Sequence, residues 1–388
     1  MLKRKNVPIL LVIVYLSFFA LGLPDGALGV AWPIIRDQMG LPLEQVSIIV
    51  IFHSIFYALS SGFSGSIASF LKLEKISFLG LISMAIGFLG FSLAPSFIVL
   101  TLMTLFSGVG MGLVDSSLNA YMAKHFSSRY MNWLHCFWGL GATVSPILMT
   151  QMILFYSWRA GYASISIIQW VTAIVVLLSL MRGVWKMEEK SHESGLSQSE
   201  RKPFLTMKRF QFMQMFIFFL YAGFEYSMSL WLPSIFMESR GMDFDIAGMY
   251  PAAYLAGITG GRMVFGFLAG KFSNISIIRS GFLMALAGLV IMIFSNNIFG
   301  VVLIGFGLGP IFPCLMHETS RRFSPSILTK LVGYQIAAVG TGVAVISSMS
   351  GQLLTRVSLE ALFPATIILV AIAFLLNETI ERNYRKVL

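Results

Sequence analysis

Twelve long apolar segments constrain the fold of this chain more than any other feature of its sequence. Each is close to the ~20 residues that an α-helix needs to cross a lipid bilayer. We expect membrane-spanning helices at residues 7–34, 44–70, 76–94, 97–122, 132–155, 160–182, 210–236, 246–270, 276–295, 297–317, 328–354 and 360–378. Because 57% of the residues are hydrophobic and only 11% are charged, the sequence predicts an all-α membrane protein with twelve transmembrane helices.

The distribution of Lys and Arg predicts how these helices are oriented. An even number of spans places both termini on one side of the membrane, and all but four of the 27 Lys and Arg residues lie toward that side. Cytoplasmic loops of membrane proteins are enriched in these residues. We therefore expect a multi-pass protein of the cell (inner) membrane with both termini in the cytoplasm. The net charge of +10 follows from this rule, so we expect a lipid bilayer and no nucleic acid as partner.

Two parts of the sequence resemble each other at a nearly constant spacing. Asp25 in the first span recurs as Glu225 in the seventh, and each acid is followed by a proline eight residues later. Gly-x-Gly-x-Gly runs that begin at Gly108 and Gly305 lie 197 residues apart. Recurrence at one offset is typical of parallel repeats in transporters. The sequence therefore predicts two six-helix bundles related by pseudo-symmetry.

The predicted bundles are residues 1–183 and 210–388, joined by a cytoplasmic linker at residues 184–209 that is rich in Ser, Glu and Lys. Such a composition is typical of a flexible segment. The sequence has no phosphate-binding loop and no nucleophile–base pair, metal cluster or cofactor loop. We therefore expect no enzyme and no ATP-driven pump, and no cofactor other than a proton as coupling ion.

Three carboxylates lie well inside apolar spans, namely Asp25, Asp115 and Glu225. An ionisable group in the hydrocarbon is costly, and it faces the bundle interior or a water-filled path. Burial disfavours the charged form of a carboxylate, so such a group can bind a proton in one conformation and release it in another. The alternative is structural, because each acid could pair with a basic or amide group and hold helices together.

Two motifs carry a resemblance to a known family. The fourth span contains GMGLVDSSLNAY from Gly110 to Tyr121, and the fifth contains LHCFWGLGATVSP from Leu134 to Pro146. With twelve spans and a central linker, the chain resembles the major facilitator superfamily and, within it, the fucose permease-like sugar:proton symporters. The sequence departs from the superfamily at the loop after the second span, where Ser69 stands in place of the usual aspartate.

The resemblance implies that Asp25 contacts substrate and that Asp115 carries the proton. Substrate-binding candidates are the acids, amides and aromatic residues of helices that face the cavity in this superfamily: Asp25, Asn119, His135, Phe137, Trp138, Tyr221, Glu225 and Gln335. Proton-coupling candidates are Asp115, Asp25 and Glu225. Asn119 lies one helical turn from Asp115, so it could hydrogen-bond that acid or substrate, or only hold helices together.

Two interpretations are open for each of three further polar residues and for the aromatic candidates. His53 and His135 are packing residues or proton relays, and Arg262 extends to the cytoplasmic interface or pairs with an acid. The aromatic side chains line a sugar site or lie at the lipid interface.

The predicted function is proton-coupled uptake of a small hydrophilic solute, favouring a sugar, by a monomer that works by alternating access. The alternatives are a drug:proton antiporter of the same fold and a sensor or scaffold that does not transport.

Overall fold

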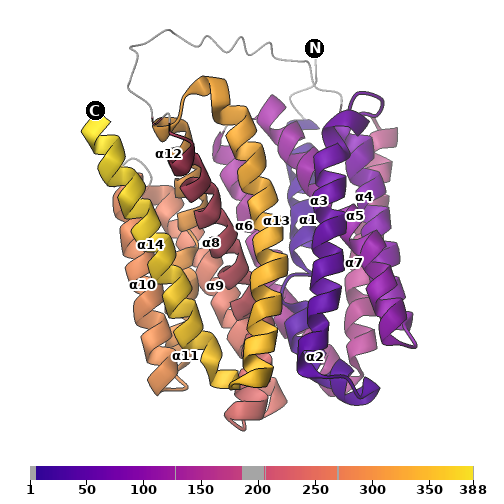
Figure 1. The fold of residues 1–388 in the computed structure, drawn as a ribbon. Coiled ribbons are helices and arrows are strands. Elements are labelled where there is room, and N and C mark those ends of the chain that lie inside the picture. Colours follow the sequence, from indigo (N-terminus) through magenta and orange to yellow (C-terminus); the bar gives the residue numbers. More distant parts are fainter. Residues whose placement is uncertain (1–5, 127, 186–204, 206, 269–270, 388) are drawn as a thin grey trace. The chain divides into compact units, whose positions relative to one another are not determined.

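The computed structural model describes residues 6–126, 128–185, 205, 207–268 and 271–387. Almost all of these residues are helical (Figure 1). The α-helices are α1 (Asn6–Gly22), α2 (Ala27–Met39), α3 (Val46–Ile67), α4 (Leu73–Leu93), α5 (Phe97–His125), α6 (Ser128–Phe155), α7 (Trp158–Met181), α8 (Lys208–Ser234), α9 (Phe244–Leu268), α10 (Asn274–Phe294), α11 (Ile298–Leu308), α12 (Ile311–Arg322), α13 (Pro325–Arg356) and α14 (Leu362–Val387).

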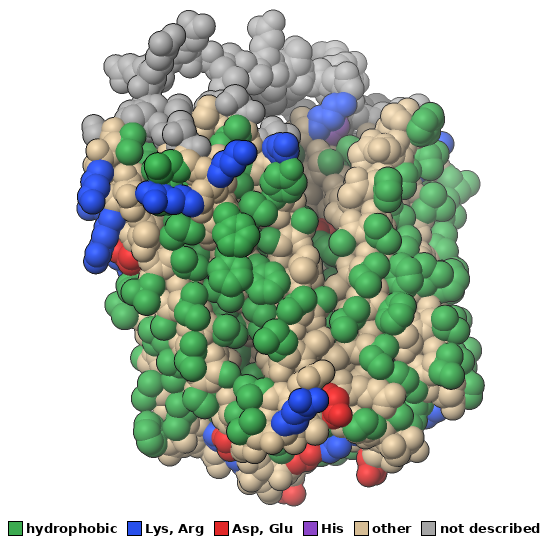
Figure 2. Space-filling model, viewed as in Figure 1, with side chains coloured by type: hydrophobic (Ala, Val, Ile, Leu, Met, Phe, Trp, Pro, Cys, Tyr) green, Lys and Arg blue, Asp and Glu red, His purple; other side chains and the backbone are tan. Residues whose placement is uncertain are grey.

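The twelve predicted spans all coincide with helices, and the all-α fold is confirmed. Among the described residues, eleven helical segments are long and apolar enough to cross a membrane. The remaining predicted span is α9, a helix of 25 residues that contains Asp245 and Arg262. On the face drawn in Figure 2, hydrophobic side chains cover the middle of the helices, and most charged side chains gather near the helix ends.

The chain divides into two compact units. Unit 1 comprises Met1–Lys190 and Leu232–Ala252, and unit 2 comprises Ser191–Trp231 and Ala253–Leu388. In each unit the helices run side by side (Figure 1). Most of the predicted linker, residues 186–204, lies outside the described residues, so the predicted domain boundaries at 183 and 210 stay a prediction.

The first predicted span is a broken helix, and Asp25 lies at the break between α1 and α2. Pro24 has no backbone N–H and cannot donate to the carbonyl of Ala20, four residues earlier. Gly26 has a φ of +82°, a left-handed conformation that glycine adopts without strain. In unit 1 the side chain of Gln169 on α7 donates to the Ala20 carbonyl oxygen at 2.6 Å. The Ala20 carbonyl, which lacks its usual donor four residues later, thus accepts from a neighbouring helix as well as from the Leu23 N–H at 3.3 Å.

The tenth predicted span is also broken, between α11 and α12. Gly309 and Pro310 form the turn that separates the two helices. The Leu308 carbonyl accepts a hydrogen bond from the Tyr221 hydroxyl at 3.0 Å, and the Gly309 carbonyl accepts one from Arg262 Nε at 3.3 Å. Polar side chains from α8 and α9 thus satisfy backbone carbonyls at this break.

The two predicted repeats pack their helices through matching glycines. A Cβ atom added to Gly141 on α6 would lie 2.0 Å from the carbonyl oxygen of Phe19 on α1. In unit 2 a Cβ atom added to Gly342 on α13 would lie 2.0 Å from the carbonyl oxygen of Phe219 on α8. Small residues permit such close helix contacts in membranes. Because Gly141 and Gly342 are 201 residues apart, both six-helix bundles contain the same helix crossing.

Candidate functional site

Asp115 on α5 accepts hydrogen bonds on both of its carboxylate oxygens. The hydroxyl of Tyr57 on α3 donates to Oδ2 at 2.6 Å, and the amide of Asn119 donates to Oδ1 at 2.8 Å. The same amide nitrogen also donates to the backbone carbonyl of Asp115 at 2.9 Å. The contact between Asn119 and Asp115 is the one that their one-turn spacing predicts. Both donors to the carboxylate are electrically neutral groups.

The glycine run of α5 explains why Tyr57 reaches Asp115. A Cβ atom added to Gly112 would lie 2.5 Å from the Tyr57 carbonyl oxygen, and one added to Gly108 would lie 2.7 Å from the His53 carbonyl oxygen. Both glycines therefore let α3 approach the backbone of α5 closely. Sequence reasoning did not identify Tyr57. The glycine run indicates that some helix packs against α5, but it does not say which residue of that helix faces Asp115.

Asp25 belongs to the same polar group of unit 1. It lies in the turn between α1 and α2 and is partly buried. Its carboxyl group contributes to the electrostatic field at the Tyr57 hydroxyl. Unit 1 therefore brings Tyr57, Asp115 and Asn119 into contact, and Asp25 acts on this group electrostatically.

The predicted aromatic residues of α6 lie against α1. Phe137 stacks on Tyr15 with ring centroids 4.9 Å apart and an interplanar angle of 13°. His135 contacts Phe18 edge-to-face at 5.8 Å. Trp138 is partly buried, and its carbonyl oxygen lies where a Cβ atom on Gly22 would stand. These three residues thus lie on the helix that packs beside the one leading to Asp25.

Glu225 in unit 2 has a charged neighbour. Arg262 Nη2 lies 3.5 Å from Glu225 Oε1, and each side chain is 17% exposed. The interpretation that Arg262 extends to the cytoplasmic interface is wrong, because this side chain reaches Glu225 and the Gly309 carbonyl instead. Tyr254 also donates its hydroxyl to the Glu225 backbone carbonyl at 3.1 Å. The acid of the second repeat therefore lies beside a cation, unlike Asp115.

Tyr221 and Gln335, two further substrate-binding candidates, form contacts inside unit 2. Both are buried, Tyr221 with its hydroxyl on the Leu308 carbonyl and Gln335 with Nε2 3.0 Å from Thr319 Oγ1. Gln214 Nε2 also approaches Thr319 Oγ1, at 3.2 Å. The role of both candidates in substrate binding stays a prediction.

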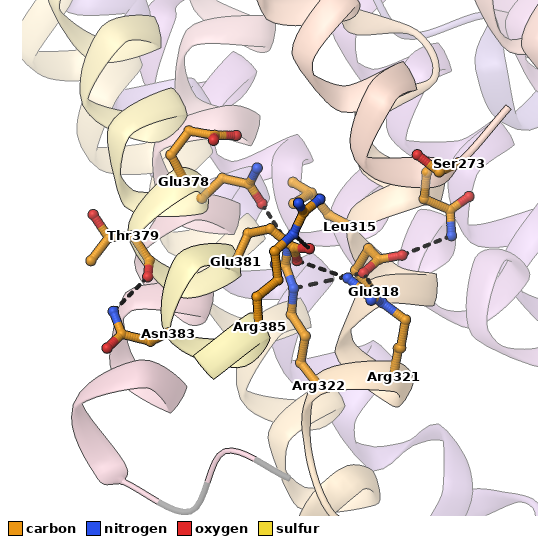
Figure 3. Close-up of polar contacts among 12 residues, drawn as sticks. Ser273, Leu315, Glu318, Arg321, Arg322, Glu378, Thr379, Glu381, Asn383 and Arg385 are labelled. Atoms are coloured by element: carbon orange, nitrogen blue, oxygen red, sulfur yellow. Dashed lines mark hydrogen bonds and ion pairs between the residues drawn. The ribbon is translucent and has the colours of Figure 1, made fainter. Parts of the chain in front are cut away.

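A buried ionic cluster joins α8, α12 and α14 of unit 2 next to Gln214. Arg322 is fully buried, and its guanidinium donates to Gln214 Oε1 at 3.1 Å, Asn377 Oδ1 at 3.0 Å and Glu381 Oε2 at 3.3 Å. Arg321 also binds Glu381, at 2.7 Å (Figure 3). From the sequence, the two arginines supported only the predicted orientation of the helices across the membrane. The sequence gives no sign that they pair with an acid about 60 residues away.

The two partly buried acids Asp115 and Glu225 differ in their neighbours. Asp115, held by neutral donors, can lose its charge by binding a proton without leaving a cation unpaired. Glu225 cannot become neutral without removing the negative partner of Arg262. Within the described part of the chain, no three His, Cys, Asp or Glu side chains come together as metal ligands.

The sequence matches a known family model and resembles several known transporters. The sequence model of the Major Facilitator Superfamily matches residues 14–328. The glucose/mannose transporter GlcP of Bacillus subtilis is 23% identical over 366 residues, which cover 88% of this chain and 87% of that protein. The cis,cis-muconate transport protein of Acinetobacter baylyi is 22% identical, covering 86% and 85% of the two chains.

Solved structures show the same fold. A bacterial homolog of the human lysosomal transporter Spinster, in an inward-facing and occupied conformation, superposes with a TM-score of 0.80 at 14% identity. The superposition covers 99% of this chain and 98% of that one.

Proposed function

The chain belongs to the Major Facilitator Superfamily, and we propose that it takes up a sugar together with a proton by alternating access. The observation that carries this proposal is the environment of Asp115, a partly buried acid whose two donors, Tyr57 and Asn119, are both neutral. A proton can neutralise this acid in one conformation and leave it in another. Proton binding that differs between conformations is the physical requirement for coupling.

Asp25 and the aromatic residues of α6 support a sugar as the substrate. Asp25 lies at a helix break, and transporters of this kind bind substrates at discontinuous helices. A carboxylate accepts hydrogen bonds from sugar hydroxyls, and an aromatic face such as that of Phe137 packs against a sugar ring. The name of the relative from Bacillus subtilis, a glucose/mannose transporter, agrees with this substrate class. We further propose a monomer in the cell membrane with both termini in the cytoplasm.

An organic anion is a second candidate substrate. Arg262 is a partly buried cation whose contact with Glu225, at 3.5 Å, is long for a hydrogen-bonded ion pair. A substrate carboxylate could replace Glu225 as the partner of this guanidinium. The relative from Acinetobacter baylyi is named for the transport of cis,cis-muconate, a dicarboxylate.

Proton flux in liposomes tests these substrates against one another. Purified protein in liposomes is given glucose, mannose, a hexuronate, cis,cis-muconate and a lipophilic cation in turn, and the pH of the outer medium is recorded. The proposal expects alkalinisation with a neutral sugar. Alkalinisation with an anion alone would support the second candidate, and acidification on adding only the cation would indicate drug:proton antiport. Empty liposomes are the control.

A further inference from the structure

The two oxygens of Asp115 face donors of different kinds. The Asn119 amide nitrogen uses its two hydrogens on two acceptors, the Asp115 backbone carbonyl at 2.9 Å and Oδ1 at 2.8 Å. Turning this amide around would place its oxygen against both acceptors. The orientation of Asn119 is therefore fixed, and Oδ1 faces a group that can only donate.

Oδ2 of Asp115 faces a hydroxyl group that can either donate or accept a hydrogen bond. A tyrosine hydroxyl has one hydrogen and also accepts hydrogen bonds. In the structure the Tyr57 hydroxyl donates to Oδ2 at 2.6 Å. If Oδ2 carried a proton, the new O–H group could donate to the Tyr57 oxygen, and the Tyr57 hydrogen would turn to another acceptor. Oδ1 offers no such exchange, because the amide nitrogen of Asn119 that faces it can only donate and cannot accept from a protonated Oδ1.

We propose that the transported proton binds Oδ2 of Asp115, and that Tyr57 is the positioning residue that admits it by changing from donor to acceptor. The inference rests on the proposed function, which makes Asp115 the proton carrier. The proton comes from water on one side of the membrane and returns to water on the other, so the step forms and breaks a single O–H bond on Oδ2. No other bond changes.

A second carboxylate acts on the Tyr57 hydroxyl. Asp115 and Asp25 both influence this hydroxyl electrostatically, the latter from the turn between α1 and α2. His53 stands one turn before Tyr57 on the same helix, and Asn119 contributes a neutral amide from α5. Asp25, the proposed sugar ligand, is therefore the acceptor that the proposal assigns to the Tyr57 hydrogen when Oδ2 is protonated.

Infrared titration of the purified protein tests this assignment. The band of a protonated carboxyl group is followed against pH and assigned to Asp115 by its loss in Asp115→Asn. In Tyr57→Phe the charged form loses a hydrogen bond that stabilises it more than the neutral form. We expect the midpoint of the band to move upward by roughly one pH unit, a tenfold rise in proton affinity. Tyr121→Phe, which removes a hydroxyl from α5 that binds the Trp185 carbonyl, should leave the midpoint unchanged.

The frequency of the same band identifies the oxygen. With the proton on Oδ2, the C=O bond is at Oδ1 and accepts from Asn119, so Asn119→Leu should raise the C=O frequency. Tyr57→Phe should not raise it in the same way. A frequency that rises in Tyr57→Phe and not in Asn119→Leu would place the proton on Oδ1 and overturn the proposal. Because the frequency in Asn119→Leu needs no tyrosine variant, it decides the point even where Tyr57→Phe does not fold.

The titration separates this inference from the proposed function, because it requires no substrate. An unshifted midpoint in Tyr57→Phe overturns the role of Tyr57 even when the liposomes show sugar-driven proton flux. A shifted midpoint with no flux for any solute supports the role of Tyr57 and refutes sugar:proton transport. An Asp115 band that never appears between the pH limits of stability overturns both.

Discussion

At the scale of single residues, the partly buried acids of the two halves have different neighbours. Asp115 accepts hydrogen bonds from neutral Tyr57 and Asn119, whereas Glu225 lies beside the guanidinium of Arg262. A buried charge without a partner is costly. Removing the charge of Glu225 should therefore destabilise unit 2, whereas a proton on Asp115 leaves no cation unpaired.

Glu225→Gln should lower the free energy of unfolding by ~1–3 kcal/mol, because Arg262 loses its negative partner in a largely buried site. Arg262→Gln alone should also destabilise, and the double variant should cost less than the sum of the two. Thermal unfolding in detergent measures all three. Strictly additive losses would show that the two side chains do not interact energetically.

At the scale of helices, side chains from neighbouring helices stabilise the breaks. Pro24 cannot donate to the Ala20 carbonyl, which accepts from the Leu23 N–H at 3.3 Å and from the Gln169 side chain on α7 at 2.6 Å. Gln169 is fully buried. The break that positions Asp25 therefore depends on a residue that is distant in sequence.

Gln169→Leu should cost ~1–3 kcal/mol of stability, since the Ala20 carbonyl would lose its side-chain donor in an apolar environment. Thr172→Val is the matched control on α7, because the Thr172 hydroxyl donates to the Ile168 carbonyl one turn earlier in its own helix. Thermal unfolding of both variants measures the difference. Equal melting temperatures for the two variants would contradict the stabilising role of Gln169.

The buried cluster of α12 and α14 allows a comparison of two arginines on one acid. Arg322 is fully buried, whereas the Arg385 side chain is 61% exposed, and both contact Glu381. Arg322→Met should cost ~3–5 kcal/mol, because it leaves buried acids with less compensation. Arg385→Met should cost at most ~1 kcal/mol, since solvent screens its ion pair. Similar losses of unfolding free energy in denaturant would contradict this assignment.

The sequence predicted the helices better than it predicted their contacts. The twelve predicted spans all coincide with helices, and Pro24 beside Gly22 and Gly26 is the sequence signal for the break at Asp25. The break at Pro310 was not predicted, although the same residue type causes it. Tyr57 could not be identified either. Its contact with Asp115 depends on how α3 and α5 are rotated toward each other, and a single sequence does not contain that rotation.

At the scale of the whole molecule, the two repeats have the same helix packing but different polar side chains. The helix contacts at Gly141 and Gly342 recur 201 residues apart. At the end of unit 1 that contains Trp185, however, the contacts are aromatic. There Tyr121 donates its hydroxyl to the Trp185 carbonyl and packs edge-to-face on its ring. Unit 2 has the ionic cluster of Arg322 and Glu381 in the corresponding region of the repeat. Duplication thus explains the packing, while each half acquired its own polar residues.

Uphill accumulation in liposomes tests whether Asp115 couples solute uptake to protons. A pH gradient is imposed, and the solute identified by proton flux is measured inside over time. We expect the unaltered protein to concentrate the solute. The Asp115→Asn variant should only exchange solute across the membrane, because exchange needs no net proton movement. If Asp115→Asn still concentrates the solute against its gradient, Asp115 is not the coupling acid and the account is wrong.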